Sequence, residues 1–429
     1  MLYKSRGAGL NRTIRRHGEV DLTFAAPPSK SYTHRALITG TLATGETVIR
    51  QPLDAVDTRL TVGALRSLGA SIAWEQEKVR IAGTGGLLSC PDGTTLDLGN
   101  SGTSLRLLAS LALLCDHPVL LTGSQRMQER PIGPLADAIT HIGGSVAFIR
   151  KPGYPPLRIT GHLTGGPVTI DGSESSQFIS SLLLAAPYAD HPMTITVAGM
   201  PASRSYLDVT VDIMRRFEAE VSEETGNIFT VSNRRRYAGQ TFTVEGDYSS
   251  ASYFFAITAI CGGRVTVTGL APASVQGDRQ FLDALAGMGC SVRYGKDAVT
   301  VERTGPLAGI TADMSSSPDT VQTLCMVAAV AESPSVITGI SHLKFKESDR
   351  ISTTAENLRR LGGDVRAGDD RIRIRPAPLH GGTIDPADDH RTAMSFAVLG
   401  LGIGGVTITD TECVDKSFPG FWQSLEGVL

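Results

Sequence analysis

Leu68-Gly69-Ala70-Ser71-Ile72 joins the end of a helical pattern to the start of an alternating strand pattern, with a glycine between the two. Variants of this junction recur at intervals of roughly 70 residues, which is longer than a solenoid repeat. A glycine, or a small residue in its place, marks each one. The further copies are Ile142-Gly143-Gly144-Ser145-Val146, Phe217-Glu218-Ala219-Glu220-Val221, Met288-Gly289-Cys290-Ser291-Val292, Leu361-Gly362-Gly363-Asp364-Val365 and a degenerate Leu425-Glu426-Gly427-Val428. The recurrence predicts six copies of one α/β unit.

Each predicted unit begins alike, with a polar cluster in front of a helix of small apolar residues. Serine, aspartate and asparagine at such positions cap helices. A turn and an alternating strand follow, as in Gly263–Gly269 and Gly405–Thr409. A second helix then leads to the glycine junction, so we expect a helix, a strand, a second helix and further strands in each unit. The six clusters are Ser29–Arg35, Gly99–Arg106, Ser173–Gln177, Gly246–Ser252, Ser315–Thr320 and Asp388–Thr392.

The polar clusters carry basic residues as well as caps. Plain capping explains any single cluster. Six clusters in equivalent positions favour a second use, because the unpaired N–H groups and the positive dipole end of a helix start attract anions. We therefore expect acidic small molecules with phosphate and carboxylate groups as ligands. The basic residues beside the clusters are Lys30, Arg35, Arg106, Arg130, Lys346, Arg350, Arg391 and Lys416.

Length and composition set the class of protein. The chain has 429 residues, which suggests two or three domains, and its formal net charge of -3 argues against a nucleic-acid-binding protein. The six cysteines form no Cys-x-x-Cys pair, so we expect no disulfides, no zinc site and a reducing compartment. The longest apolar stretch, Ala393–Thr409, is interrupted by four glycines and predicts a helix and a strand rather than a membrane span. The sequence thus predicts a soluble, cytoplasmic protein.

An ordered series of motifs between about Pro27 and Pro419 resembles the enolpyruvyl transferases, and within them the shikimate branch. One such motif would be weak support, whereas the complete series in order is specific. The motifs are Ser29-Lys30-Ser31 with Arg35, Gly99-Asn100-Ser101-Gly102-Thr103 with Arg106, Glu129-Arg130-Pro131, Ser175-Ser176-Gln177-Phe178, Ser203 with Tyr206, Glu245-Gly246-Asp247, Pro318-Asp319, Lys346-Glu347-Ser348-Asp349-Arg350, Asp389-His390-Arg391 and Lys416-Ser417-Phe418-Pro419.

The resemblance implies a fold class and a domain division. The fold is α/β (α+β), with two globular lobes of three repeated helix-strand units each, an inside-out α/β barrel arrangement. One lobe is expected to hold residues 1–27 together with 246–429, and the other residues 28–245. The chain would cross between them near Pro27-Pro28 and near Glu245-Gly246-Asp247. The active site is expected in the cleft between the lobes.

The resemblance also implies a reaction of the shikimate pathway, on the way to chorismate and the aromatic amino acids. The 5-hydroxyl of shikimate 3-phosphate attacks C2 of phosphoenolpyruvate while C3 takes up a proton. The tetrahedral adduct then loses phosphate, and C3 loses a proton. Such chemistry must gather strongly anionic substrates, supply a base and an acid, and exclude water.

For shikimate 3-phosphate the resemblance implies a binding set of hydroxyl, amide and charged side chains. Tyr206 would pack against the ring, although a buried structural tyrosine is an equal alternative. The implied set is Lys30, Ser31, Arg35, Ser175, Ser176, Gln177, Ser203, Asp319, His342 and Lys346.

For phosphoenolpyruvate the resemblance implies a clamp of basic side chains, whose planar guanidinium forks suit carboxylate and phosphate. Gly102 belongs to it through what it lacks, since a side chain there would press on the bound substrate. With glycine at this position we expect sensitivity to glyphosate. The implied set is Lys30, Gly102, Arg130, Gln177, Arg350, Arg391 and Lys416.

The expected catalytic residues are Lys30, Asp319 and Glu347, and which of them moves which proton stays open at this point. In the family pattern Asp319 serves the 5-hydroxyl and Glu347 the methylene carbon. The plain alternatives are a Pro-Asp helix cap for Asp319 and a surface Lys-Glu pair for Glu347. No metal or cofactor is implied, and we expect a monomer that acts on small molecules with no nucleic-acid or membrane partner.

Two positions depart from the family pattern. His342 stands where asparagine is common, and Leu107 follows Arg106 where many relatives have proline. Two other functions remain in view. The first is the sister branch that uses UDP-N-acetylglucosamine, which has a reactive cysteine before its Arg-Pro; Ser124–Glu129 contains none. The second is a non-catalytic anion-binding protein, against which the intact set of basic and acidic residues argues.

Overall fold

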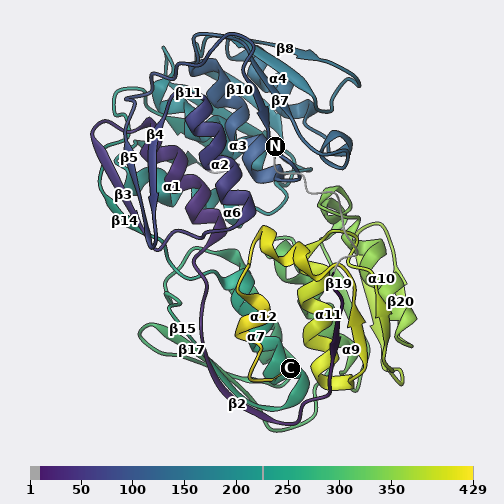
Figure 1. Cartoon of the computed structure of the whole chain (residues 1–429). Coiled ribbons are helices and arrows are strands. Elements are labelled where there is room, and N and C mark those ends of the chain that lie inside the picture. Colours follow the sequence, from purple (N-terminus) through teal and green to yellow (C-terminus); the bar gives the residue numbers. More distant parts are fainter. Residues whose placement is uncertain (1–9, 225–226, 429) are drawn as a thin grey trace. The chain divides into compact units, whose positions relative to one another are not determined.

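The computed structural model describes residues 10–224 and 227–428. The chain folds into two compact units, one of residues 1–27 and 246–429 and the other of residues 28–245 (Figure 1). It passes from one unit to the other at Pro27–Pro28 and at Glu245–Gly246. We call them the discontinuous unit and the continuous unit.

One repeat of the continuous unit shows the pattern of all six. Strand β6 is parallel to β7, β7 is antiparallel to β9, and β8 and β9 form an antiparallel hairpin, so the sheet order is β6-β7-β9-β8. A helix connects the two parallel strands, and a second helix connects β7 to the hairpin. The elements are β6 (Thr95–Asp97), α3 (Gly102–Ala109), β7 (Val119–Thr122), α4 (Gly133–His141), β8 (Gly144–Phe148) and β9 (Leu157–Gly161).

The other two repeats of the continuous unit have the same order. The first takes its outermost strand, β14, from the far end of the unit, where it pairs in parallel with β3. Its elements are β14 (Thr241–Thr243), α1 (Lys30–Leu42), β3 (Glu46–Arg50), α2 (Val56–Ser67), β4 (Ser71–Glu75) and β5 (Lys78–Ala82). The third comprises β10 (Gly166–Asp171), α5 (Ser176–Ala185), β11 (Met193–Ala198), α6 (Ser205–Arg216), β12 (Val221–Glu224) and β13 (Ile228–Val231).

The discontinuous unit repeats the pattern with strands borrowed from the N-terminal segment. The fourth repeat has β2 (Val20–Ala25), α7 (Tyr248–Cys261), β15 (Gly263–Thr268), α8 (Gln280–Gly287), β16 (Ser291–Tyr294) and β17 (Ala298–Arg303). The fifth has β18 (Thr311–Asp313), α9 (Val321–Ala329), β19 (Ser335–Thr338), α10 (Arg350–Arg360), β20 (Asp364–Ala367) and β21 (Arg371–Arg375). The sixth has β22 (Gly382–Ile384), α11 (His390–Ile403), β23 (Val406–Ile408) and α12 (Phe421–Ser424).

The sixth repeat is the degenerate one that the sequence predicted. Among residues 10–224 and 227–428 it has no hairpin, and β1 (Arg12–Ile14) pairs antiparallel with β23 in place of the hairpin's second strand. The prediction of helix, strand, helix and further strands is thus confirmed, with this truncation in the last copy.

The first helix of each repeat lies in the interior of its unit. In α7 every residue from Tyr248 to Ile260 is buried, and in α1 every residue from Tyr32 to Leu42. A helix that is buried on all sides must be apolar or small all round, which explains the Ala, Ser and Thr content of these segments. In Figure 1, α7, α9 and α11 pack against one another, with strands of the same unit outside them. In the described part of the chain, no helix has the length and apolar character that a membrane crossing requires.

The glycine junctions adopt the left-handed backbone that the repeats require. Gly69, Gly143, Gly289 and Gly362 have φ of 89°, 103°, 105° and 89°. In the third repeat this conformation falls on Glu218, with φ of 71°. The expectation of a small residue at every junction is therefore wrong at this copy, where a residue with a Cβ accepts a conformation that favours glycine.

Candidate active site

The two units divide the predicted site residues between them. The continuous unit carries Lys30, Ser31, Arg35, Gly102, Arg130, Ser175, Ser176, Gln177 and Ser203. The discontinuous unit carries Asp319, His342, Lys346, Glu347, Arg350, Arg391 and Lys416.

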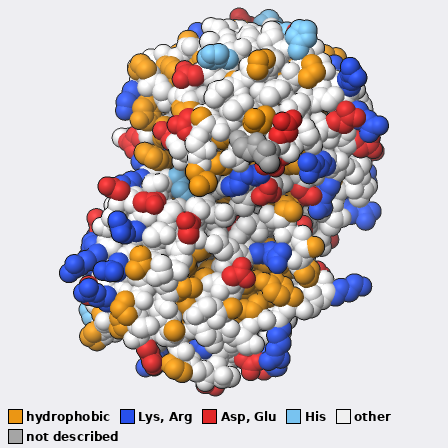
Figure 2. All heavy atoms as spheres, turned by 180° about the vertical axis from the view of Figure 1, so that it is seen from behind, with side chains coloured by type: hydrophobic (Ala, Val, Ile, Leu, Met, Phe, Trp, Pro, Cys, Tyr) orange, Lys and Arg blue, Asp and Glu red, His pale blue; other side chains and the backbone are white. Residues whose placement is uncertain are grey.

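The arginines of the site differ from ordinary surface arginines in burial. Figure 2 shows lysine and arginine side chains interspersed with acidic ones over one face of the molecule. Arg35 and Arg350 are each only 2% exposed, and Arg130 is 3% exposed. A buried guanidinium requires partners for its donors, so the partners of these three residues define what each can do.

Helix caps set the local geometry at five of the six helix starts. Ser29, Ser101 and Ser175 accept hydrogen bonds from backbone N–H groups of α1, α3 and α5. Asp247 and Asp389 do the same for α7 and α11. The cluster before α9 departs from the expectation, because no side chain caps that helix and a short 3₁₀ turn, η5 (Pro318–Thr320), precedes it.

Arg35 lies in α1 among neutral oxygen atoms of its own unit. Its Nε donates to Thr210 Oγ1 at 2.7 Å, and its Nη2 donates to Ser180 Oγ at 3.3 Å. Its Nη1 and Nη2 also donate to the backbone oxygens of Ser31 and Tyr206 at 3.0 and 3.2 Å. We call these five residues the arginine–hydroxyl cluster. Burial lowers the pKa of the Arg35 guanidinium to about 10, because none of these partners carries a compensating negative charge.

Lys30, the residue that begins α1, has a carboxylate partner. Its Nζ lies 3.4 Å from Asp57 Oδ2, and the Asp57 side chain is 2% exposed. Asp57 lies in the first turn of α2, where a negative charge also suits the helix dipole. Asp57 was not predicted from the sequence, because nothing local marks a residue 27 positions from its partner.

Gln177, in the first turn of α5, connects two repeats of the continuous unit. Its Oε1 accepts from Arg106 Nη1 at 3.1 Å, and its Nε2 donates to Thr103 Oγ1 at 3.0 Å. Arg106 also donates to the Pro131 backbone oxygen at 3.1 Å. The starts of α3 and α5 are thus linked through side chains at the positions the sequence indicated.

Gly102 lies directly against the guanidinium of a second buried arginine, Arg130. A Cβ at this position would come within 2.5 Å of Arg130 Nη2 and 2.6 Å of its Cζ. The prediction that a side chain would press on the bound substrate is thus modified: the first group it would displace is the Arg130 guanidinium. Arg130 also donates to the Asn100 backbone oxygen at 3.4 Å.

The predicted serines of the continuous unit are mostly buried. Ser175 and Ser176 are 7% and 3% exposed, and Ser203 is 3% exposed with a left-handed φ of 57°. Left-handed backbone at a serine is uncommon and is found more often at functional sites than elsewhere. Ser31 is only half-buried.

Arg350, the first residue of α10, binds three carboxylates of the discontinuous unit. Its Nη1 donates to Asp319 Oδ1 at 3.0 Å and its Nη2 to Glu347 Oε2 at 2.8 Å. Asp389 accepts from Nε at 2.8 Å and from Nη2 at 3.4 Å. We call these four residues the arginine–carboxylate cluster. Although burial disfavours the charged form, the three carboxylates raise the pKa of Arg350 above its ordinary value.

Two further basic residues attach to the arginine–carboxylate cluster. Arg391 Nη2 donates to Asp319 Oδ2 at 2.6 Å, and its Nη1 donates to the Tyr253 hydroxyl at 3.3 Å. Lys416 Nζ lies 3.8 Å from Glu347 Oε1. Asp319 is therefore not a helix cap and Glu347, 9% exposed, is not one half of a surface pair. Both plain alternatives from the sequence are wrong.

Asp389 belongs to one of the sequence motifs, but no role was predicted for it from the sequence. Its side chain is fully buried, and it accepts hydrogen bonds from Arg350, from Ser348 Oγ at 3.1 Å and from the Arg391 backbone N–H. One carboxylate thus fixes two of the predicted phosphoenolpyruvate ligands. The signal was present in the sequence, since an aspartate that caps a helix stood directly before His390-Arg391.

His342 and Lys346 belong to the turn that precedes α10. His342 is 4% exposed, and burial together with the charge of Lys346 lowers its pKa to about 3. The imidazole is therefore neutral across the physiological pH range, and offers a hydrogen bond rather than a charge. In this respect it resembles the asparagine that it replaces. The other departure, Leu107, is fully buried within α3.

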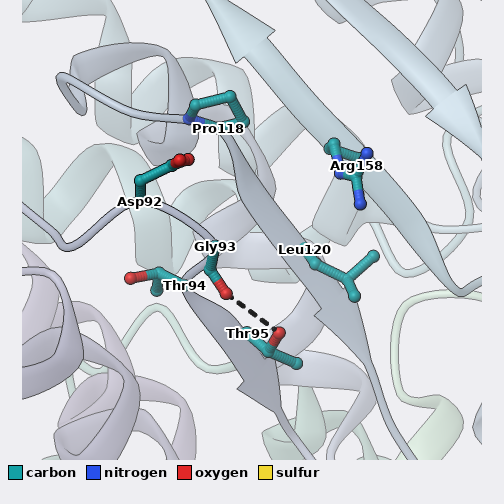
Figure 3. A pocket seen from close by; sticks show the side chains of 7 residues that line it. All are labelled: Asp92, Gly93, Thr94, Thr95, Pro118, Leu120 and Arg158. Carbon is teal, nitrogen blue, oxygen red and sulfur yellow. Dashed lines mark hydrogen bonds between the residues drawn. The ribbon is translucent and has the colours of Figure 1, made fainter.

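A small cavity of about 260 Å³ lies elsewhere in the continuous unit, beside β6 and β7. Figure 3 shows Asp92 and Arg158 on its wall, and none of the predicted site residues lines it. In the part of the chain that the structure describes, no group of three or more His, Cys, Asp or Glu side chains is arranged to hold a metal ion.

Comparisons with known proteins identify the family of the chain. A family model described as EPSP synthase (3-phosphoshikimate 1-carboxyvinyltransferase) matches residues 14–425. A protein of Methanoregula boonei with the name 3-phosphoshikimate 1-carboxyvinyltransferase is 62% identical over 97% of this chain and 99% of its own length. A protein of Serratia proteamaculans with the same name is 41% identical over 95% of this chain and 96% of its own length.

A solved structure of EPSP synthase from Acinetobacter baumannii has a TM-score of 0.80 and 29% sequence identity, and covers 97% of this chain and 98% of that chain. These matches confirm the predicted two-lobe fold and favour the shikimate branch over the branch that uses UDP-N-acetylglucosamine. The chain belongs to the EPSP synthase (3-phosphoshikimate 1-carboxyvinyltransferase) family.

Proposed function

We propose that this protein transfers the enolpyruvyl group of phosphoenolpyruvate to the 5-hydroxyl of shikimate 3-phosphate and releases phosphate. The observation that carries the proposal is the arginine–carboxylate cluster, in which Arg350 holds both Asp319 and Glu347. Binding of two anions and transfer of two protons demand such a combination of buried cations and carboxylates. A protein that only binds anions has no need of buried carboxylates beside its cations, since they repel the ligand.

We assign shikimate 3-phosphate chiefly to the continuous unit. Arg35 supports this role, because a buried guanidinium with neutral partners gains most from a charged ligand. Ser31, Ser175, Ser176, Gln177 and Ser203 of the same unit add hydrogen-bond donors and acceptors to the proposed set. His342, Lys346 and Asp319 of the discontinuous unit complete the proposed set.

We assign phosphoenolpyruvate to the arginines that are held in place by other side chains. Arg350 and Arg391 are oriented by Asp389 and Asp319. Arg130, above Gly102, together with Lys416 and Gln177, completes the proposed clamp. Lys30 would contact both substrates and neutralise charge as the adduct forms. Preorganised donors of this kind stabilise developing charge without moving during the reaction.

The proposed proton transfers use Asp319 and Glu347. In the addition step the O5–C2 bond forms, the O5 proton passes to Asp319, and C3 of phosphoenolpyruvate gains a proton from the side of Glu347. In the elimination step the bond from C2 to the phosphate oxygen breaks and the departing phosphate takes up the proton that O5 gave to Asp319. C3 returns its proton to the side of Glu347, and the C2–C3 double bond forms again. Glu347 lies between Arg350 and Lys416, which is a suitable environment for a group that gives and regains a proton.

A phosphate-release assay with both substrates tests the proposal. We expect phosphate only when shikimate 3-phosphate and phosphoenolpyruvate are present together, and inhibition by glyphosate that is competitive with phosphoenolpyruvate. A folded protein that releases no phosphate from this pair contradicts the proposed function. We also propose that the protein acts as a monomer in the cytoplasm. The six free thiols support a reducing compartment, and light scattering measures the oligomeric state.

A further inference from the structure

Asp278 is a buried carboxylate to which the proposed reaction gives no role. It lies in a 3₁₀ turn, η4 (Gly277–Arg279), and is 3% exposed. Burial and the negative charge of Asp319 raise its pKa to about 6, so the group is mostly ionised at neutral pH. A buried charged carboxylate needs hydrogen-bond donors, and the donors to Asp278 indicate its role.

Two hydroxyl groups donate to Asp278. Ser249 Oγ, in the first turn of α7, lies 2.5 Å from Oδ2, and Ser317 Oγ lies 3.2 Å from Oδ1. Ser317 is the residue that directly precedes η5, the turn that contains Asp319. Its hydroxyl also lies 2.7 Å from Thr320 Oγ1, on the other side of Asp319. Asp278 therefore holds Ser317, the residue before the turn that presents Asp319, and Ser317 in turn contacts Thr320 at the end of that turn.

The segment that carries Asp278 is held by hydrogen bonds of Gln276. Gln276, two residues before Asp278 and 6% exposed, donates from Nε2 to the Gly246 backbone oxygen at 2.8 Å. Its Oε1 accepts from the Tyr248 backbone N–H at 3.1 Å. Gly246 is the first residue after the chain enters the discontinuous unit for the second time. The turn from Gln276 to Asp278 thus connects the start of α7 to the turn of Asp319.

Asp319 requires such an anchor when substrate is present. Its side chain is held by Arg350 at 3.0 Å and by Arg391 at 2.6 Å. An anionic ligand on these arginines competes with Asp319 for the same donors, which loosens the side chain at the moment when it must act. The contacts of Asp278 with Ser317 involve neither arginine and survive that competition.

We propose that Asp278 is a positioning residue that acts through Ser317 to hold Asp319 in its reactive place while substrate occupies Arg350 and Arg391. The inference rests on the proposed function of Asp319. Charged groups that act on Asp278 are Asp319 and Asp247, which repel it, and Arg391, which attracts it.

Steady-state kinetics of Asp278→Ala tests the proposal. We expect kcat to fall about 100-fold while the KM of each substrate changes less than threefold, because misplacement of a reacting group acts on the chemical step. Asp278→Asn, which retains an acceptor for Ser317, should recover most of that loss. Asp283→Ala, an exposed carboxylate in the first turn of α8, is the matched control and should keep the wild-type kcat.

Ser317→Ala removes the donor of the hydrogen bond between Ser317 and Asp278. It tests the same proposal if Asp278→Ala fails to fold. We expect the same direction of change, and the double variant Asp278→Ala/Ser317→Ala should be no slower than Asp278→Ala. Losses that multiply, an unchanged kcat in Ser317→Ala, or no recovery in Asp278→Asn would overturn the proposal.

A crystal structure of Asp278→Ala separates this inference from the proposed function. In crystals that contain phosphoenolpyruvate, so that an anion occupies Arg350 and Arg391, we expect the Asp319 carboxylate to leave the place it has in wild type, whichever reaction the protein catalyses. An inactive wild-type protein contradicts the proposed function alone, whereas an unmoved Asp319 contradicts the positioning role alone.

Discussion

The arginine–hydroxyl cluster and the arginine–carboxylate cluster each centre on an arginine that is 2% exposed, yet the two have opposite surroundings. Arg35 donates only to neutral oxygens in the part of the chain that the structure describes, whereas Arg350 donates to three carboxylates. Burial therefore lowers the pKa of Arg35, while the carboxylates raise that of Arg350. The first arrangement suits a ligand that brings the missing negative charge, and the second suits carboxylates that must be oriented and kept charged.

The difference suggests a division of labour between the two units. Around Arg35 the continuous unit offers a buried positive charge and hydroxyl groups, which select an anion with several oxygens. The discontinuous unit offers both signs of charge, which proton transfer requires. The same repeat thus supports two kinds of chemistry, which depend on the side chains around the helix starts.

Arg350→Met should give the largest effect, on both activity and stability. It leaves Asp319, Glu347 and Asp389 buried without their shared cation, so we expect a loss of ~3–5 kcal/mol in the free energy of unfolding. We also expect phosphate release to fall more than about 1,000-fold. Urea unfolding and the coupled assay measure the two quantities. Arg360→Met, exposed on the same helix, is the control and should stay within about 0.5 kcal/mol of wild type.

Arg35→Met should separate binding from stability. No carboxylate loses its partner, and removal of a desolvated charge offsets the lost hydrogen bonds, so the free energy of unfolding should change by about 1 kcal/mol or less. The KM for shikimate 3-phosphate should rise roughly 100-fold. A loss of stability as large as that of Arg350→Met would break the comparison between the clusters.

Gly102→Ala should have an intermediate effect that is confined to phosphoenolpyruvate. The new Cβ, 2.5 Å from Arg130 Nη2, forces the guanidinium aside, and the KM for phosphoenolpyruvate should rise about 10-fold, or about 1.4 kcal/mol. Glyphosate should inhibit the variant less than wild type. Gly133→Ala is the matched control, because its Cβ would meet nothing nearer than 3.6 Å. An equal rise in the KM for shikimate 3-phosphate would contradict the assignment.

His342→Asn should have the smallest effect on activity and a sharp effect on pH dependence. The folded pKa of about 3 lies below the ordinary 6.5, so wild type loses stability as pH falls from about 6.5 towards 3, because only the unfolded chain binds the proton. At pH 5 this loss is about 2 kcal/mol relative to pH 8, and the variant should lack it. Urea midpoints at the two pH values measure it. We expect kcat at pH 7 within about threefold of wild type.

The sequence predicted the repeats and most of the helix starts, because caps and glycine junctions are local signals. Ser29, Ser101, Ser175, Asp247 and Asp389 cap their helices as capping preferences indicate. The junction at Glu218 shows the limit of a local rule, since the left-handed backbone falls there on a residue with a Cβ.

The sequence could not predict which charges meet. Asp57 reaches Lys30 and Asp278 reaches Ser317 only through the packing of separate helices and turns, and neither pair has a local pattern. The position of Gly102 beneath Arg130 likewise depends on how a turn from one part of the repeat lies against another. The motif residues were predictable from resemblance, whereas contacts such as that of Asp57 with Lys30 depend on the packing of separate elements.

Phosphate release titrated with shikimate 3-phosphate, at saturating phosphoenolpyruvate, in Arg35→Met and Glu347→Gln tests the division of labour most directly. One titration gives both the KM and the limiting rate of each variant. We predict that Arg35→Met raises the KM roughly 100-fold and keeps a limiting rate within about tenfold of wild type. Glu347→Gln should keep the KM within about threefold and lose the rate about 1,000-fold. The reverse pattern, or equal losses of both quantities in both variants, would contradict the account.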